Sequence, residues 1–220
     1  MSDHKQPLSL VVLISGHGSN LKAILDAISR GELTAVVTAV ISDKPRAPGL
    51  EYARQENIDT LALDAADYPD RKDYDRALQG LIDRFEPDLV VLAGFMRILT
   101  AAFVHHYQGR LINIHPSLLP ELRGIDTHQR AIDKGVKEHG ASVHFVTEEL
   151  DGGPVFVQVR VPVLPVDDAE RLAARVLRQE HRLYPQAIQW LAEGRVSLNG
   201  EQLLLDQQPM QQPLQIDADE

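Results

Sequence analysis

The chain contains no cysteine, and that absence rules out several kinds of site. Disulfide bonds, zinc centres with thiolate ligands and a cysteine nucleophile are all excluded. A chain without cysteine also fits a reducing compartment. We therefore expect a cytoplasmic protein.

The chain also lacks long apolar runs and an excess of basic residues. No stretch approaches the roughly 18 uninterrupted apolar residues of a membrane span. The apolar run Leu8–Ile14 stops at Ser15-Gly16 without a signal-peptide cleavage pattern. The formal net charge of −10 argues against a nucleic-acid binder, which usually carries a basic patch. We expect neither a membrane nor a nucleic acid as a partner, while a local cationic pocket for a phosphate is still allowed.

What the chain does contain is a regular alternation of apolar runs and amphipathic stretches. The expected strands are residues 8–14, 34–41, 60–63, 89–93, 111–115, 141–147 and 155–163. The expected helices are residues 20–30, 49–56, 71–85, 100–107 and 169–191. A closing hairpin is expected over residues 196–198 and 201–205, with its turn at Asn199-Gly200.

This alternation predicts one domain of the α/β class. Strands that are apolar on both faces, separated by amphipathic helices, indicate a parallel sheet wrapped by helices. The expected fold is Rossmann-like, with a mostly parallel central sheet flanked by helices and an antiparallel extension in the C-terminal half. A chain of 220 residues can bury one full core, so we expect a single domain over residues 1–206. Residues 207–220, rich in Gln, Pro and acidic residues, are expected to form a flexible tail.

A glycine-containing segment, Ser15–Asn20, follows the first expected strand and begins the first expected helix. An open α/β sheet binds phosphate at this place, because the helix amino terminus offers free N–H groups and the positive end of its dipole. The third glycine of a dinucleotide fingerprint is missing, since Leu21 occupies its place, and the Lys-Ser/Thr pair of a Walker loop is absent. A phosphate site and a tight turn capped by Ser19 or Asn20 both fit the segment.

Three polar residues near the ends of expected strands suggest a catalytic site. Asn113 and His115 close the strand 111–115 and share one face, since residues i and i+2 of a strand point the same way. Asp151 precedes two glycines, and that loop can bring its carboxylate to the imidazole and favour the charged form. Amide, imidazole and carboxylate together suit a reaction that builds negative charge on oxygen while protons move.

Each of these residues also has an ordinary structural interpretation. Asn113 can tie a strand end to a loop, His115 can be a packing histidine, and Asp151 can form a turn. The catalytic interpretation depends on their shared position near the carboxyl ends of neighbouring strands, where α/β enzymes place their chemistry. Ser117 lacks the Gly-x-Ser-x-Gly elbow of a nucleophile. The histidines show no metal-ligand spacing, so no metal is expected.

Several stretches, taken in order over nearly the whole chain, resemble the phosphoribosylglycinamide formyltransferases, folate-dependent enzymes of purine synthesis. They are Val11–Leu21, Val91–Leu99, Asn113–Pro120, Glu138–Val146, Leu150–Pro154, Gln179–His181 and Tyr184-Pro185. Asn-x-His with Leu-Leu-Pro and Asp-Gly-Gly-Pro is shared by all formyl-folate transferases, and Ser-Gly-x-Gly-Ser-Asn narrows the set.

The resemblance implies that a formyl group passes from the co-substrate 10-formyltetrahydrofolate to the amine of glycinamide ribonucleotide in de novo purine biosynthesis. The amine would attack directly, through a tetrahedral intermediate, without a metal, in a monomer or homodimer. The implied catalytic residues are Asn113, His115 and Asp151. The implied phosphoribosyl contacts are Gly18, Ser19, Asn20 and Glu180. The implied folate contacts are Arg71, Met96, Arg97, Ile98, Leu99, Asn113, Thr147, Glu148, Glu149, Leu150 and Asp151.

Two other functions fit the same residues. A formyltetrahydrofolate hydrolase uses the same three catalytic groups with water as acceptor, and a nucleotide-binding regulator would use the glycine segment alone. The chain also departs from the family pattern in two places. Residues Glu121–Thr127 stand where relatives more often carry Lys/Ala-Tyr/Phe-Pro-Gly and a histidine at 126, which is Asp126 here. Leu177 stands where a glutamine often helps to bind the nucleotide substrate.

Overall fold

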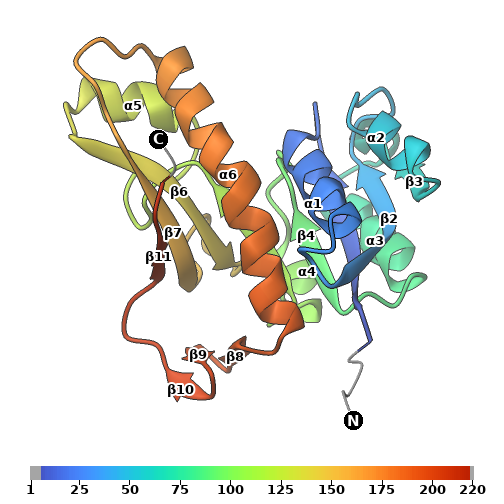
Figure 1. Cartoon of the computed structure of the whole chain (residues 1–220). Helices are drawn as coiled ribbons and strands as arrows, with labels where there is room; N and C mark the ends of the chain where they lie inside the picture. The colour runs from blue at the N-terminus through green and yellow to red at the C-terminus, as the bar shows by residue number, and fades with distance from the viewer. Residues whose placement is uncertain (1–5, 219–220) are drawn as a thin grey trace.

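The structure, a computed structural model, describes residues 6–218 and is built around one eight-stranded sheet (Figure 1). Its strands are β1 (Leu8–Ile14), β2 (Ala35–Ser42), β3 (Asp59–Ala62), β4 (Leu89–Leu92), β5 (Leu111–His115), β6 (Glu138–Phe145), β7 (Val155–Pro162) and β11 (Leu214–Ile216). The helices are α1 (Ser19–Ser29), α2 (Leu50–Gln55), α3 (Arg71–Asp83), α4 (Ala101–His106), α5 (Thr127–Asp133) and α6 (Ala169–Ala192), with a 3-10 turn at Ala65–Asp67. A small second sheet contains β8 (Val196–Asn199), β9 (Gln202–Leu205) and β10 (Gln208–Pro209).

The order and direction of the strands confirm the predicted fold class. The main sheet runs β11-β7-β6-β5-β4-β1-β2-β3. Strands β1 to β5 pair in parallel with one another, whereas β6 pairs antiparallel with both β5 and β7. The sheet is therefore mostly parallel, with its antiparallel extension in the C-terminal half.

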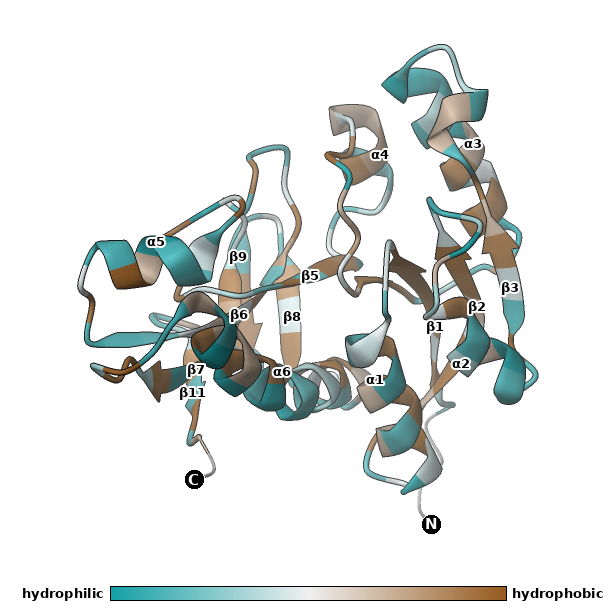
Figure 2. Ribbon diagram, turned by 90° about the horizontal axis from the view of Figure 1, so that it is seen from above, coloured by the Kyte–Doolittle hydropathy of each residue, from teal (hydrophilic) through white to brown (hydrophobic). Residues whose placement is uncertain are grey.

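The parallel strands are apolar on both faces because helices cover both faces of the sheet. Along β1, Leu10, Val12 and Ile14 belong to one buried cluster, whereas Val11 and Leu13 belong to another. The first cluster includes residues of α1, α2 and α6, and the second includes residues of α3 and α4. Figure 2 shows these helices on opposite sides of the strands. This division follows from the two-residue period of a strand.

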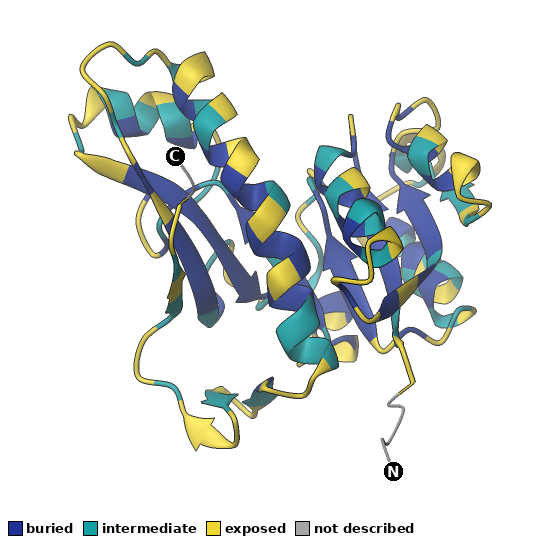
Figure 3. Cartoon of the chain, viewed as in Figure 1, coloured by how far each residue is buried: buried dark blue, intermediate teal, exposed yellow. Residues whose placement is uncertain are grey.

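Helix α6 lies across the sheet with one face buried (Figure 3). The hydroxyl of Tyr184 on this face donates a hydrogen bond to the carbonyl of Leu92 at 2.9 Å. It also reaches the carbonyl of Ile112 at 3.3 Å, so α6 is tied to both β4 and β5. Within residues 6–218, no helix combines the length and apolar character of a membrane span.

Two local details differ from the sequence-based prediction. Helix α5 is not predicted, because only Thr127 and Ala131 of its seven residues are buried and no apolar stripe results. The hairpin of β8 and β9 turns at Gly200-Glu201, one residue later than expected, since Asn199 pairs with Gln202.

The segment predicted as a flexible tail contains strands. Strand β10 pairs with β9, and β11 adds to the edge of the main sheet in parallel with β7. Leu214 and Ile216 of β11 pack against the apolar core. Both strands therefore pair with strands of the domain predicted over residues 1–206. The flexibility of residues 207–220 stays a prediction. Residues 219–220 lie outside the described part of the chain.

The order of the strands reverses at β1 and β4, and the loops after these two strands meet. The backbone N–H of Ser15 donates to the carbonyl of Gly94 at 3.2 Å, and the N–H of Met96 donates to the hydroxyl of Ser15 at 2.8 Å. Open α/β sheets bind their ligands at such a reversal, outside the carboxyl ends of the strands. The fold therefore places the glycine segment and the loop 93–99 beside the end of β5.

Candidate active site

Strands β5 and β6 bring polar side chains together at the edge of this region. In their antiparallel register Asn113 lies opposite His144, and His115 lies opposite Ser142. Cross-strand partners point to the same face of a sheet. Asp151 comes from the turn between β6 and β7, in a left-handed conformation with φ 48°. The local geometry of two strands and one turn thus assembles the polar cluster.

The three predicted catalytic residues lie close together. Nδ1 of His115 is 3.5 Å from Oδ2 of Asp151, and their side chains are 7% and 10% exposed. Asn113 and Asp151 line the same cavity, whereas His115 contacts Asp151 without being part of that lining. Nε2 of His115 is 3.1 Å from the carbonyl oxygen of Leu122. Because a carbonyl oxygen only accepts, Nε2 carries a proton.

His144, to which the sequence analysis assigns no role of its own, orients Asn113. Its Nδ1 is 3.0 Å from the carbonyl oxygen of Phe145, so Nδ1 carries the proton. Burial lowers the pKa of His144 to about 4, which leaves the ring neutral at pH 7 with Nε2 as an acceptor. Nδ2 of Asn113 donates to that Nε2 at 3.3 Å. One N–H of the Asn113 amide is engaged in this way, and the second is directed elsewhere.

The loop Glu121–Thr127 contacts two of the predicted catalytic residues through its backbone. The carbonyl of Leu122 accepts from His115, and the N–H of Gly124 donates to Oδ2 of Asp151 at 2.9 Å. The same carboxylate oxygen therefore faces both Gly124 and His115. The sequence departs from the family pattern in this loop, and no motif pointed to its backbone contacts.

Most of the predicted folate residues surround the cavity next to Asn113, which has a volume of 90 Å³. Its lining includes Arg97, Ile98, Leu99, Asn113, Thr147, Glu148, Glu149, Leu150 and Asp151. Two predicted residues lie outside that lining. Met96 is 73% exposed and lines a neighbouring cavity at the glycine segment. Arg71 is exposed at the first residue of α3.

The glycine segment lines the neighbouring cavity, of 310 Å³. Gly18, Ser19 and Asn20 all contribute to it, as does Lys44. Gly18 has φ 72°, and a Cβ there would lie 2.7 Å from the Cα of Gly49, so this turn requires glycine. Lys44 is a cation that sequence reasoning missed, because it follows β2 and belongs to no motif.

Glu180, the fourth predicted phosphoribosyl contact, supports the glycine segment from α6. Its Oε2 accepts a hydrogen bond from Nδ2 of Asn20 at 2.8 Å. Burial raises the pKa of Glu180, and the hydrogen bond from Asn20 acts against that rise. Through Asn20, this hydrogen bond links Glu180 to the glycine segment that lines the cavity.

Other candidate chemistry finds no support among the described residues. Within residues 6–218, no group of three or more His, Asp or Glu side chains could hold a metal ion. Ser117 is buried, and its hydroxyl donates to the carbonyl of Glu121 at 2.6 Å. That contact gives Ser117 a structural role in the 116–121 turn.

Comparison with known proteins decides the family. The family model described as Formyl transferase matches residues 8–188. A phosphoribosylglycinamide formyltransferase from Escherichia coli (strain K12) is 53% identical over 201 residues, which cover 91% of this chain and 95% of that protein. The chain belongs to the phosphoribosylglycinamide formyltransferases.

Solved structures agree with this family. The phosphoribosylglycinamide formyltransferase from Coxiella burnetii superposes with a TM-score of 0.92 at 47% identity, over 96% of this chain and 99% of that one. A formyltetrahydrofolate deformylase from Pseudomonas putida KT2440 has the same fold, with a TM-score of 0.82, but only 28% identity over 93% of this chain and 72% of that one. The resemblance inferred from motifs is confirmed, and in sequence the chain is nearer to these formyltransferases than to this deformylase.

Proposed function

We propose that the chain transfers the formyl group of 10-formyltetrahydrofolate to the amine of glycinamide ribonucleotide, a step of de novo purine biosynthesis. One observation carries the proposal: Asn113, His115 and Asp151 converge beside a cavity, in a chain 53% identical to a phosphoribosylglycinamide formyltransferase. A cytoplasmic location belongs to the proposal and fits a chain without cysteine.

The proposed chemistry is a direct attack of the amine on the formyl carbon. A carbon–nitrogen bond forms, the formyl oxygen becomes negatively charged, and the bond from the formyl carbon to N10 of the folate then breaks. The second N–H of Asn113 supplies a donor for that oxyanion, since the first N–H is held by His144. Asp151 faces His115, and the pair, with a bound water, moves the proton from the attacking amine to N10.

His115 has a second role in the proposal, which needs a small rearrangement. Its Nε2–H donates to the carbonyl of Leu122 in this structure. To join Asn113 at the oxyanion, it exchanges that carbonyl for the substrate oxygen. The exchange involves one hydrogen bond of a loop residue and no movement of β5.

The cavity between the loop 95–99 and the β6–β7 turn is the proposed folate site. Its apolar lining includes Ile98, Leu99 and Leu150, which suits a flat aromatic ring. At 90 Å³ the open space is small, so we expect the side chains of Ile98 and Leu150 to shift when the co-substrate binds. Both side chains are exposed, which makes such a shift inexpensive.

The cavity at the glycine segment is the proposed site of the substrate phosphate. Ser19 and Asn20 begin α1, whose free N–H groups favour an anion. Lys44 adds a positive charge to the same cavity. Glu180 accepts a hydrogen bond from Asn20, and its carboxylate adds an acceptor for a hydroxyl group of the substrate.

The test is an assay with 10-formyl-5,8-dideazafolate and glycinamide ribonucleotide. The proposal expects deformylated folate to appear only when the amine is present. Deformylation without the amine would instead identify a hydrolase. Isothermal titration separates the regulator, which would bind the nucleotide but not the folate analogue.

A further inference from the structure

An ion pair joins the loop 121–127 to the turn that carries Asp151. Nη1 of Arg123 donates to Oε1 of Glu149. Arg123 is 35% exposed and Glu149 is 67% exposed, so the pair lies at the rim of the site. Arg123 belongs to the stretch in which this chain departs from the pattern of its family, and nothing in the reaction described above uses it.

The two partners of this ion pair are close neighbours of the groups that fix Asp151. Gly124, which follows Arg123, donates its N–H to Oδ2 of Asp151 at 2.9 Å. The N–H of Gly152, which follows Asp151, donates to the carbonyl of Glu149 at 3.0 Å and closes the turn. The ion pair therefore links the segment Arg123-Gly124, which contacts the Asp151 carboxylate, to the turn that carries Asp151.

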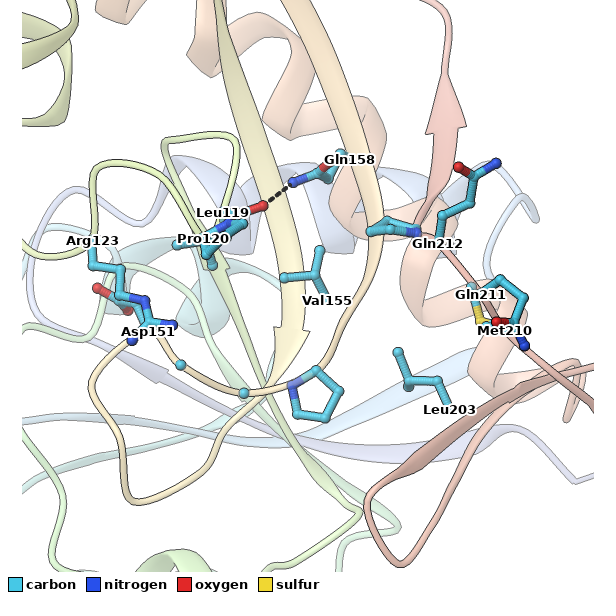
Figure 4. Close-up of a pocket in the computed structure, with 14 residues that line it drawn as sticks. Leu119, Pro120, Arg123, Asp151, Val155, Gln158, Leu203, Met210, Gln211 and Gln212 are labelled. Carbon is cyan, nitrogen blue, oxygen red and sulfur yellow. Dashed lines mark hydrogen bonds between the residues drawn. The ribbon is translucent and has the colours of Figure 1, made fainter.

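Arg123 also lies where the loop borders a second cavity, which shares Asp151 with the proposed folate site. This cavity has a volume of 410 Å³, and Arg123 and Asp151 line it at the end away from Leu203 and Met210 (Figure 4). On this side the loop contacts the Asp151 carboxylate through the backbone N–H of Gly124.

The loop itself needs anchors, because its backbone is strained. Leu122 and Asp126 have φ 55° and 57°, in the left-handed region that non-glycine residues avoid. Arg130 anchors the loop from α5, with Nη1 donating to the carbonyl of Arg123 at 2.6 Å and to that of Ile125 at 3.0 Å. The pair of Arg123 with Glu149 is the anchor on the catalytic side.

We propose that Arg123 is a positioning residue for the formyl transfer. Its ion pair with Glu149 holds Gly124 against Asp151 and so directs the Asp151 carboxylate toward His115. Leu122 lies before both anchors, so its carbonyl can release His115 while Arg123 and Gly124 stay in place. This inference rests on the proposed function, because the effect is measured on that reaction.

The test compares Arg123→Met, Glu149→Gln, the double variant and the charge exchange Arg123→Glu with Glu149→Arg. Exposed ion pairs contribute little, so we expect each single variant to lower kcat/KM for the formyl-folate by about two- to fivefold. The double variant should be no worse than the poorer single one, because both remove the same contact. The charge exchange should recover at least half of the loss, and KM for glycinamide ribonucleotide should not change.

The control is Arg160→Met, which removes a similar exposed pair with Glu138 far from the site, at 3.2 Å with 49% and 59% exposure. It should leave kcat/KM unchanged. A second readout is hydrogen exchange at the amide of Gly124, which should be faster in Arg123→Met and unaltered in the control.

Two outcomes would overturn the inference: single-variant effects that multiply in the double variant, or an unchanged or raised kcat/KM together with unchanged exchange at Gly124. A wild-type chain that transfers no formyl group would contradict the proposed function instead. The exchange measurement does not depend on activity, so the two failures are distinguishable.

Discussion

Asn113 and His144 face each other across β5 and β6, with Nδ2 of the amide 3.3 Å from Nε2 of the imidazole. Only one assignment of donor and acceptor is possible for this hydrogen bond. Nδ1 of His144 donates to Phe145, and burial lowers the pKa of His144 to about 4, so Nε2 must accept. The oxygen of the Asn113 amide is thereby turned away from His144, and the second N–H of the amide is available to another acceptor.

We expect Asn113→Ala to lower kcat by about 10²–10³, the usual effect of removing one oxyanion donor. The fold should survive, because Asn113 is only half-buried. Steady-state kinetics and a thermal melt measure the two properties. Asn199→Ala, on the exposed β8–β9 hairpin, is a matched control that should leave both unchanged. Near-normal turnover in Asn113→Ala would remove this residue from the chemistry.

His144→Leu should lower kcat by about tenfold, less than the loss of the donor itself, because Asn113 stays but is no longer held in one orientation. His144→Gln offers an acceptor at a similar position and should recover part of the loss. KM for both substrates should change little, since the substitution alters the orientation of a group that acts in the transition state. Equal kcat values for His144→Leu and the wild type would show that Asn113 keeps its orientation by other means.

Two buried histidines should make the protein less stable in mild acid. Burial lowers the pKa of His139 and of His144 to about 4 each, against about 6.5 in an unfolded chain. Between these pH values the unfolded state binds more protons, so the free energy of unfolding falls as pH decreases from 6.5 toward 4. The slope is at most about 1.4 kcal/mol per pH unit for each histidine.

Urea unfolding at several pH values between 7.5 and 4.5 measures this slope. Glu180 has a raised pKa through burial and acts in the opposite direction, so the comparison must be made with variants. His139→Gln and His144→Gln should each flatten the dependence. Variants that keep the wild-type slope would contradict the assignment.

The parallel strands themselves were predictable because their signal is local. Each of β1, β4 and β5 is a short apolar run, and runs that are apolar on both faces indicate a sheet covered on both sides. Helix α5 and strand β11 gave no such signal. Both elements mix polar and apolar residues. Contacts with distant parts of the chain hold them in place, such as the pairing of Leu214 with Val157.

Motifs identified the predicted site residues. The residues that they missed act through contacts between separate strands or loops. His144 could have been found, because Ser142 and His144 alternate along a strand expected next to the antiparallel turn. Its partner Asn113 is fixed only by the register of β5 against β6, which the sequence does not give. The ion pair of Arg123 with Glu149 joins two loops and carries no pattern at all.

The C-terminal segment offers the last prediction, which tests where the domain ends. A chain that stops at Asp206 loses β11, and with it the pairing of Leu214 and Ile216 along β7. These partly buried side chains pack against the core, and each contributes on the order of 1 kcal/mol. The hydrogen bond from Nε2 of Gln215 to Oε1 of Gln158, at 3.4 Å, is lost as well.

We expect this truncation to lower the free energy of unfolding by about 2–4 kcal/mol, from the lost apolar contacts and strand pairing together. Denaturant unfolding measures it, and a chain lacking only residues 219–220 is the control. The residual activity of folded protein should stay close to the control, because β11 lies at the far edge of the sheet from β5, beyond β6 and β7. Equal midpoints for the two chains would mean that the residues after 206 add nothing to the domain and behave as a tail.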